Sequence, residues 1–168
     1  MKRSPAPLVV NGWSIFAHPL FLDQLDALMA QVEKARARDP GTYLQKNAAK
    51  RLAAIARLAF DLIPQDPTRA EYRLGDTLGP DHRHWFRAKF FQQHRLFFRY
   101  SAAARVIIYA WVNDEHTKRA YESGSDAYRV FQRMIARGHP PDDWSALLAE
   151  ATAQAGRLRG SLGRLKGK

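Results

Sequence analysis

The chain has 168 residues, of which 46% are hydrophobic and 26% charged, and a formal net charge of +11. This length suffices for one domain with a hydrophobic core. The absence of cysteine excludes disulfides and thiolate metal sites and fits a reducing cytoplasm, which is the location we expect. No apolar run is as long as a membrane span or a signal peptide requires, so we expect no membrane partner.

Positive charge is concentrated in the second half of the chain. Residues 4–81 contain nine basic and nine acidic residues, whereas residues 82–139 contain eleven basic and four acidic ones. Residues 156–168 carry five basic residues and no acidic one. This distribution favours a polyanionic partner such as RNA or DNA. Charge alone is equally consistent with a solvated surface that only aids solubility.

The first half predicts a strand followed by two helices. The apolar run 9–17 is typical of a strand. Apolar residues then recur at helical spacing in two segments, and Asp39-Pro40 is expected to end the first helix and begin the second. Pro64 ends the second helix. Two helices joined by a short turn predict an antiparallel hairpin.

After residue 70 the apolar period changes from 3.6 to 2, which indicates strands. Three β-like runs, Trp85–Phe91, Arg95–Tyr100 and Arg105–Val112, are separated by short connections and predict an antiparallel meander. Residues 71–78 are a weaker candidate for an additional edge strand.

The chain then returns to helical patterns. Tyr128, Phe131 and Ile135 share one face of a predicted helix over Ala127–Arg137, and a last helix begins after Asp142 or Asp143. Glycine and basic residues dominate the remainder and predict a disordered tail. We therefore expect one domain over residues 1–155 and a basic Gly/Arg-rich tail over residues 156–168.

Alternation within the first two β-like runs places four cations, Arg87, Lys89, Arg95 and Arg99, on one side of the sheet. The helical hairpin is expected to cover the opposite side. Guanidinium groups bind phosphate oxygens bidentately, and neighbouring aromatic rings can stack on unpaired bases, so this face suits RNA. The alternative is an ordinary solvated sheet face.

Further polar residues follow the third β-like run, between Asn113 and Tyr121. Loops held by a strand end frequently bind ligands, although Asn113 or Asp114 could simply cap the next turn. His94, at the turn between the basic strands, is a candidate proton carrier or a plain surface residue. His82 and His84 have no nearby carboxylate at a useful spacing, so we expect no metal site.

Several short motifs in series resemble one known family over residues 9–150. They are Val10-Asn11-Gly12-Trp13, Ala17-His18-Pro19, Arg95–Ser101, Trp111–Glu115, Asp126-Ala127-Tyr128 and Arg137–Trp144. In this order they resemble the YhaV-type toxins of type II toxin–antitoxin systems, in the RelE/ParE superfamily. The resemblance implies an α+β, RelE/ParE-like fold, with an N-terminal helical hairpin packed on a small antiparallel sheet and with C-terminal helices.

The resemblance also implies a function and partners. The expected activity is cleavage of mRNA, on translating ribosomes, by attack of the ribose 2′-hydroxyl on the neighbouring phosphate without metal or cofactor. The expected partner is a PrlF-type antitoxin protein, and the pair would bind operator DNA. The alternative is a non-catalytic binding protein of the same fold: a co-repressor, a topoisomerase-directed toxin or a ribosome or RNA binder.

Position relative to the family assigns roles to residues of this chain. Those expected to act in catalysis and transition-state binding are Lys89, Arg95, Arg99, Arg119 and Tyr121. Those expected to contact RNA are Arg87, His94, Asn113, Asp114, Thr117 and Lys118.

Overall fold

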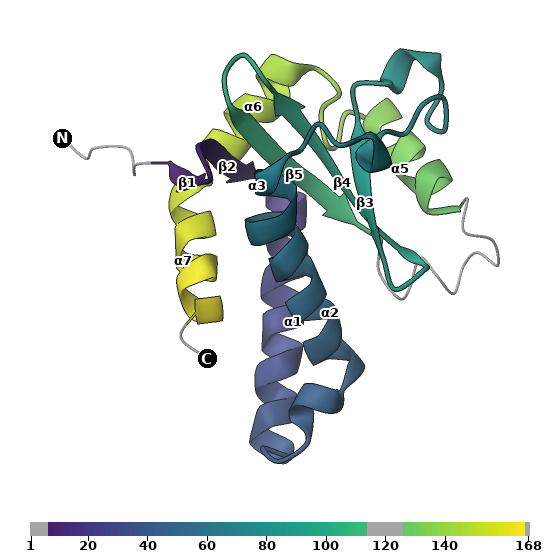
Figure 1. Cartoon of the computed structure of the whole chain (residues 1–168). Coiled ribbons are helices and arrows are strands. Elements are labelled where there is room, and N and C mark those ends of the chain that lie inside the picture. The colour runs from purple at the N-terminus through teal and green to yellow at the C-terminus, as the bar shows by residue number, and fades with distance from the viewer. Residues whose placement is uncertain (1–6, 114–125, 167–168) are drawn as a thin grey trace.

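The computed structural model describes residues 7–113 and 126–166. A five-stranded sheet is flanked by helices on both faces (Figure 1). Its strands are β1 (Leu8–Val10), β2 (Trp13–Ala17), β3 (Phe86–Phe90), β4 (His94–Ser101) and β5 (Val106–Val112). The spatial order is β1-β2-β5-β4-β3, in which β2 and β5 are parallel and all other neighbours antiparallel. The fold is thus α+β, and the predicted meander is confirmed as β3, β4 and β5.

The expectation of a purely antiparallel sheet preceded by a helical hairpin is wrong. The apolar run 9–17 is divided at Asn11-Gly12, whose φ values of 50° and 81° suit the two-residue turn that joins β1 to β2. Both strands precede the hairpin. Strand β2 pairs in parallel with β5, and the long connection between them contains the helical hairpin and strands β3 and β4.

The predicted helical hairpin is confirmed. Helices α1 (Pro19–Arg38) and α2 (Asn47–Arg57) lie side by side and extend beyond the sheet (Figure 1). Helix α2 continues through a π-helical turn, η2 (Leu58–Leu62), into α3 (Ile63–Gln65).

The second helix does not begin at Pro40 as expected. After α1, the amides of Thr42 and Tyr43 bond to the carbonyl of Asp39, and a 3-10 turn, η1 (Tyr43–Gln45), follows. These bonds delay the start of α2 until Asn47.

Two hydrophobic cores lie on opposite faces of the sheet. Helices α1 and α2 cover the first core, to which Leu96 and Phe98 of β4 contribute. Helices α5 (Asp126–Ala136) and α6 (Trp144–Thr152) cover the second core, to which Phe97 contributes. The register of β4 and β5 shifts between Phe97 and Phe98, so the consecutive residues Ala110 and Trp111 both face the second core.

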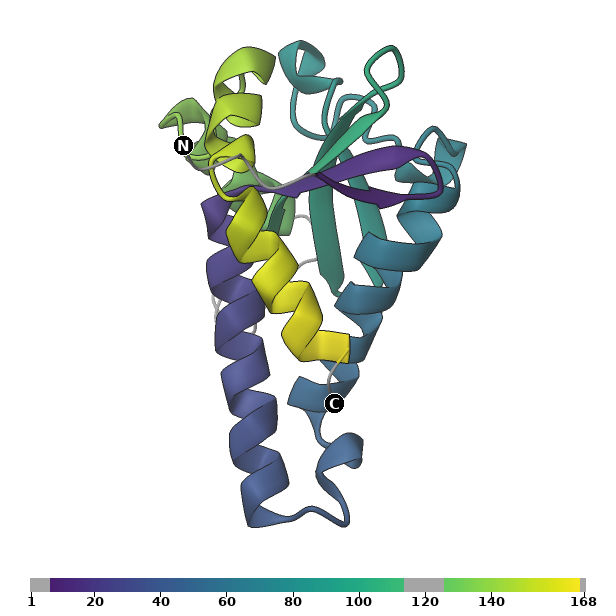
Figure 2. The same ribbon diagram turned by 90° about the vertical axis from the view of Figure 1, so that its left-hand side faces the viewer.

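The expectation of disorder after residue 155 is also wrong, because helix α7 (Ala155–Lys166) crosses the side of the hairpin (Figure 2). Leu158 is 1% exposed and belongs to the first core. Arg157 forms ion pairs of 2.6 Å with Asp23 and 2.9 Å with Asp26, both on α1. Contacts with a helix more than 130 residues away in sequence therefore order a segment whose glycines predict disorder.

The segment before β3 does not form the additional edge strand. Ala70–Tyr72 is a 3-10 turn, η3, and Arg73 makes an isolated bridge to Phe86 of β3. Among residues 7–113 and 126–166, no helix has the length and apolar character needed to cross a membrane.

Candidate active site

The predicted alternation along β3 and β4 is confirmed, but the side that carries the four cations is not an open basic surface. Phe97 lies between Arg95 and Arg99, is fully buried and stacks on Phe131 of α5 with ring centroids 4.3 Å apart. Helix α5 covers this side because Tyr128, Phe131 and Ile135 all pack into the second core. The cations therefore lie around the margin of a core, in two separate places.

At the first place, the hydroxyl of Tyr128 accepts hydrogen bonds from two guanidinium groups. Arg87 Nε lies 2.9 Å and Arg95 Nε 3.1 Å from Tyr128 Oη. We call these three residues the Tyr128 centre. Neighbouring β-strands supply the two arginines, and the first turn of α5 supplies the tyrosine.

Main-chain carbonyls hold both guanidinium groups in place. Arg95, which is 9% exposed, donates from Nη1 to the carbonyls of Gln92 and His94 at 2.7 and 3.0 Å. Arg87 donates from Nη1 to the carbonyls of Glu71 and Arg73 at 2.9 and 3.0 Å. Within the described ranges neither arginine has an ion-pair partner. Guanidinium groups bind phosphate and carboxylate oxygens, so this pair suits an anionic ligand.

The surroundings of Tyr128 shift its acidity. Burial raises the pKa of the phenol, but the hydrogen bonds and positive charges of Arg87 and Arg95 outweigh this, so the pKa of Tyr128 is lowered. The two guanidinium groups favour the phenolate because they stabilise its negative charge. In its phenolate form such a group can take up a proton from a substrate hydroxyl while the cations bind a phosphate.

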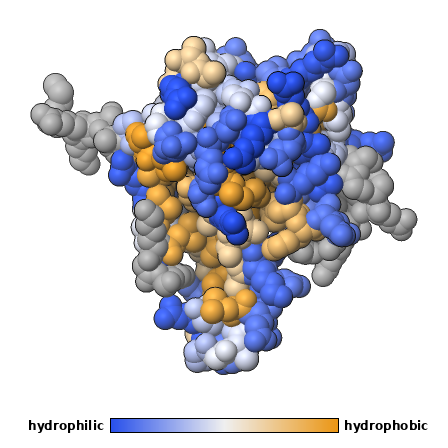
Figure 3. All heavy atoms as spheres, in the orientation of Figure 1, coloured by the Kyte–Doolittle hydropathy of each residue, from blue (hydrophilic) through white to orange (hydrophobic). Residues whose placement is uncertain are grey.

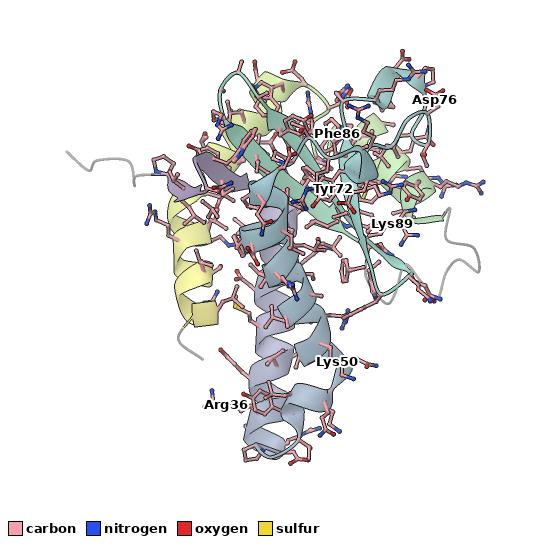
Figure 4. The ribbon with its side chains drawn as sticks, in the orientation of Figure 1. Arg36, Lys50, Tyr72, Asp76, Phe86 and Lys89 are labelled. Atoms are coloured by element: carbon pink, nitrogen blue, oxygen red, sulfur yellow. The ribbon has the colours of Figure 1, made fainter. Side chains whose placement is uncertain are left out.

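A basic groove runs along β3, the edge strand of the sheet. Its volume is about 580 Å³, and it is lined by Leu58, Leu62, Arg69, Ala70, Glu71, Tyr72, Arg73, Arg87, Ala88 and Lys89. We call it the β3-edge groove. Figure 3 shows hydrophilic side chains over this part of the molecule, and Figure 4 shows Tyr72 and Lys89 close together there. Arg87 belongs both to the groove and to the Tyr128 centre.

Lys89 is the exposed member of the four predicted cations. It pairs with Arg95 in the register of β3 and β4. Lys89 also lines the β3-edge groove, so it is an exposed cation of the groove beside an arginine of the Tyr128 centre.

Arg99 lies at the second place, away from the Tyr128 centre. Its Nη1 donates to the carbonyl of Asp142 at 2.6 Å, and its guanidinium carbon lies 5.6 and 5.1 Å from the ring centroids of Trp85 and Trp144. Burial lowers the pKa of Arg99, against the opposing charges of Asp142 and Asp143. Arg99 lies four positions after Arg95 along β4, which corresponds to about 13 Å. The expected single row of cations is therefore divided.

His94 is not an exposed turn residue, and it faces away from the Tyr128 centre. It is 4% exposed and stacks on Phe90, with ring centroids 5.1 Å apart, on the side that the hairpin covers. Its Nδ1 lies 3.1 Å from the carbonyl of Asn113 and must donate to it. His94 thus lies on the other side of the sheet from the Tyr128 centre, and its role toward RNA stays a prediction.

Asn113 positions Arg95. Its buried side chain accepts from the Arg95 amide through Oδ1 at 2.6 Å and donates from Nδ2 to the carbonyl of Gln93 at 2.8 Å. These bonds fix the start of β4 and the turn before it, and the predicted RNA contact of Asn113 stays a prediction. The other predicted residues of this segment, Asp114, Thr117, Lys118, Arg119 and Tyr121, lie outside the described residues.

Residues 15–152 match the sequence model of a family described as a toxin with endonuclease activity, of a toxin–antitoxin system. The chain belongs to this family, the YhaV toxins. Its relatives include Toxin YhaV of Escherichia coli O6:H1 (strain CFT073) and Ribonuclease toxin YhaV of Escherichia coli K12. Each is 44% identical over 146 residues, which are 86% of this chain and 95% of the relative. No solved structure matches the chain.

As a YhaV toxin the chain is an endonuclease, and its system includes an antitoxin partner. From its place on an apolar helix face we assigned Tyr128 to the core alone, and the sequence did not show that its hydroxyl would contact charged side chains. The signal was nevertheless present, since a tyrosine on a buried face needs a hydrogen-bond partner for its hydroxyl. In this YhaV toxin those partners are Arg87 and Arg95.

Proposed function

We propose that this toxin cleaves RNA and that the Tyr128 centre, with Lys89, carries out the cleavage without a metal ion. One observation carries the proposal: two fixed guanidinium groups without ion-pair partners among the described residues hold one phenol oxygen. The name of the K12 relative, a ribonuclease toxin, supports RNA as the substrate.

The chemistry follows from these charges. Tyr128, as phenolate, accepts the proton of a ribose 2′-hydroxyl, and the 2′-oxygen attacks the adjacent phosphorus. Arg87 and Arg95 stabilise the negative charge of the pentavalent phosphorane. The bond between phosphorus and the 5′-oxygen then breaks, the 5′-oxygen takes up a proton from solvent, and Tyr128 releases its proton to solvent. The products are a 2′,3′-cyclic phosphate and a 5′-hydroxyl end.

We propose that the β3-edge groove binds the RNA backbone on its way to the Tyr128 centre. Arg69, Arg73 and Lys89 supply positive charge along the groove, and Glu71 is its one acidic lining residue. Cations spaced along a groove suit the phosphates of a single strand. Arg87 connects the groove to the Tyr128 centre, where the reacting phosphate would bind, since it belongs to both.

The remaining proposals rest on membership of the family. We propose a RelE/ParE-like arrangement for the α+β fold, mRNA on the ribosome as substrate, and a PrlF-type antitoxin whose complex with the toxin binds operator DNA. Arg119 and Tyr121 stay proposed as catalytic residues, and Asp114, Thr117 and Lys118 as RNA contacts.

A mapping of mRNA 5′ ends in cells tests the proposal. Wild type, Arg87→Ala, Arg95→Ala and Arg36→Ala are expressed, each with and without an inhibitor of translation initiation. Arg36 is an exposed arginine far along the hairpin and serves as the matched control (Figure 4). We expect new 5′ ends with wild type and Arg36→Ala, and a large loss of these ends with the other two variants.

The outcomes separate the competing functions. Growth arrest with intact mRNA would contradict the nuclease and support a non-catalytic binder or a toxin directed at a topoisomerase. New ends that persist when translation is blocked would contradict ribosome dependence while leaving RNA cleavage in place.

A further inference from the structure

A second group of polar side chains lies beside Arg99 at the edge of the second core, where Asp142 contacts both Arg99 and Trp85. His82 ends a 3-10 turn, η4 (Pro80–His82), His84 follows it, and Asp142 precedes α6. Asp142 Oδ1 lies 3.3 Å from His82 Nδ1 and 2.7 Å from His84 Nε2. All three atoms lie within 4.8 Å of one another. The carboxylate that the sequence did not place near the histidines is thus supplied from 58 residues away.

We propose that His82, His84 and Asp142 bind a divalent transition-metal ion, Zn²⁺ above all, as a structural site. In a tetrahedral zinc site with bonds of about 2.0–2.1 Å, neighbouring ligand atoms lie about 3.3 Å apart. The distance from Asp142 Oδ1 to His82 Nδ1, 3.3 Å, equals this value, and the distance to His84 Nε2, 2.7 Å, has to lengthen by about 0.6 Å to admit the ion. Two imidazoles and one carboxylate form a donor set for zinc, with one position left for water, whereas Ca²⁺ and Mg²⁺ prefer oxygen ligands alone.

The surroundings of the three side chains support a metal site. Trp85 Nε1 donates to the same Asp142 Oδ1 at 2.7 Å and thereby orients the carboxylate, as outer-shell partners of metal ligands do. Both histidines are only partly buried, so an ion can reach them from solvent. Among the described residues, no other hydrogen bond fixes either ring in one tautomer. Both rings can therefore present a lone pair to the ion.

A second cluster of the same kind lacks these properties. His18, His139 and Glu150 also bring ligand atoms within 4.8 Å of one another. However, His18 Nδ1 accepts the amide of Leu20 at 3.2 Å and caps α1, so the neutral ring carries its proton on Nε2. That proton points to Glu150 at 3.1 Å. The nitrogen that faces the cluster is consequently a donor, and binding a metal there would break the helix cap.

The proposed ion would hold together the surroundings of Arg99. Residues 73–85 connect η3 to β3 and contain only the short turn η4 as regular structure. The ion would fasten this loop to the segment before α6, which supplies Trp144 and the Asp142 carbonyl to Arg99. The site takes no part in RNA cleavage, which we assign to the Tyr128 centre.

Zinc binding by the full-length protein, purified without an affinity tag, tests the site. The chain contains no cysteine, so thiolates cannot contribute. Isothermal titration with ZnCl₂ and metal analysis after desalting are applied to wild type, Asp142→Asn, His84→Ala, His82→Ala and Glu150→Gln. Glu150→Gln is the matched control because it changes the same chemical group in the second cluster. Absorption of the Co²⁺-substituted protein reports the coordination geometry.

We expect one Zn²⁺ per chain in wild type and in Glu150→Gln, and tetrahedral Co²⁺ bands in both. We expect affinity to fall by about tenfold or more in the three ligand variants. Zinc should raise the thermal unfolding midpoint of wild type and fail to raise that of Asp142→Asn, which preserves the shape of the side chain and an acceptor for Trp85. Equal zinc affinity in wild type and the ligand variants, or no binding by folded wild type, would overturn the site without affecting the cleavage proposal.

Discussion

Removing one oxygen atom from Tyr128 tests the candidate active site most selectively. Tyr128→Phe keeps the ring, which lies edge-on to Phe97 with centroids 5.7 Å apart, and therefore keeps the packing of α5. It removes the acceptor of Arg87 Nε and Arg95 Nε. The proposed base is lost, while both cations stay in position through their bonds to main-chain carbonyls.

The expected magnitudes follow from these contacts. A positioned general base contributes about 10²–10⁴-fold to a rate, so kcat for RNA cleavage should fall within this range. KM should change little because Arg87 and Arg95 remain. A hydrogen bond to a charged group contributes about 1.5–3 kcal/mol. Water can replace the lost acceptor at the half-buried Arg87 but not at Arg95, so the free energy of unfolding should fall by about 1–3 kcal/mol.

Single-turnover cleavage of a labelled RNA, together with urea denaturation, measures both effects. Tyr43→Phe, which removes a hydroxyl near the far end of the hairpin, is the matched control. The reasoning is refuted if Tyr128→Phe cleaves at the wild-type rate, or if it loses activity only because it is unfolded under the assay conditions.

Further predictions concern four other features. The lowered pKa of Tyr128 implies that the cleavage rate rises with pH through this pKa and then levels off. It also implies that Tyr128 contributes to the free energy of unfolding. This contribution is complete above the unfolded pKa of about 10 and is lost as pH falls through the folded pKa. A pH–rate profile and denaturation of wild type and Tyr128→Phe at several pH values check both signs. Lys89→Ala should weaken RNA binding and reduce the slope of the logarithm of the binding constant against the logarithm of salt concentration by about 0.7. Lys50→Ala, at an exposed position on α2, should change neither quantity (Figure 4). Fluorescence anisotropy at several salt concentrations measures both. Asn113→Ala should lower the free energy of unfolding by about 1–3 kcal/mol, because it removes the hydrogen bonds to the Arg95 amide and the Gln93 carbonyl. It should also lower kcat, since these bonds position Arg95. Unchanged cleavage would contradict this positioning role. Leu158→Ala in α7 should cost about 2–5 kcal/mol in urea denaturation, and a neutral result would mean that α7 does not complete the first core.

Features that depend on local pattern could be predicted from the sequence. The pattern of β3 predicted both the strand and its two faces, because side chains of a strand alternate whatever covers them. Phe86, Ala88 and Phe90 lie on the face of the first core, and Arg87 and Lys89 alternate with them. The hairpin of α1 and α2 followed in the same way from helical periodicity.

Features that depend on distant contacts could not be predicted. Tyr128 becomes a site residue only because α5 docks on the side of β4 that carries Arg95. The glycine-containing segment of α7 is helical because Asp23 and Asp26 of α1 bind its arginines. The parallel pairing of β2 with β5 likewise has no local signature. In each case the partner lies far away in the chain, so neither propensity nor spacing identifies it.

The chemical identity of the cut ends tests the central claim most directly. Purified wild-type protein is incubated with a translating extract and an RNA in which a single cleavage position is either a ribonucleotide or a 2′-deoxyribonucleotide. The proposed chemistry predicts a 5′-hydroxyl end and a 2′,3′-cyclic phosphate from the first substrate and no cut at that position in the second. Cleavage of the deoxy-substituted position, or ends that carry a 5′-phosphate, would contradict attack by the 2′-hydroxyl and with it the role assigned to Tyr128, Arg87 and Arg95.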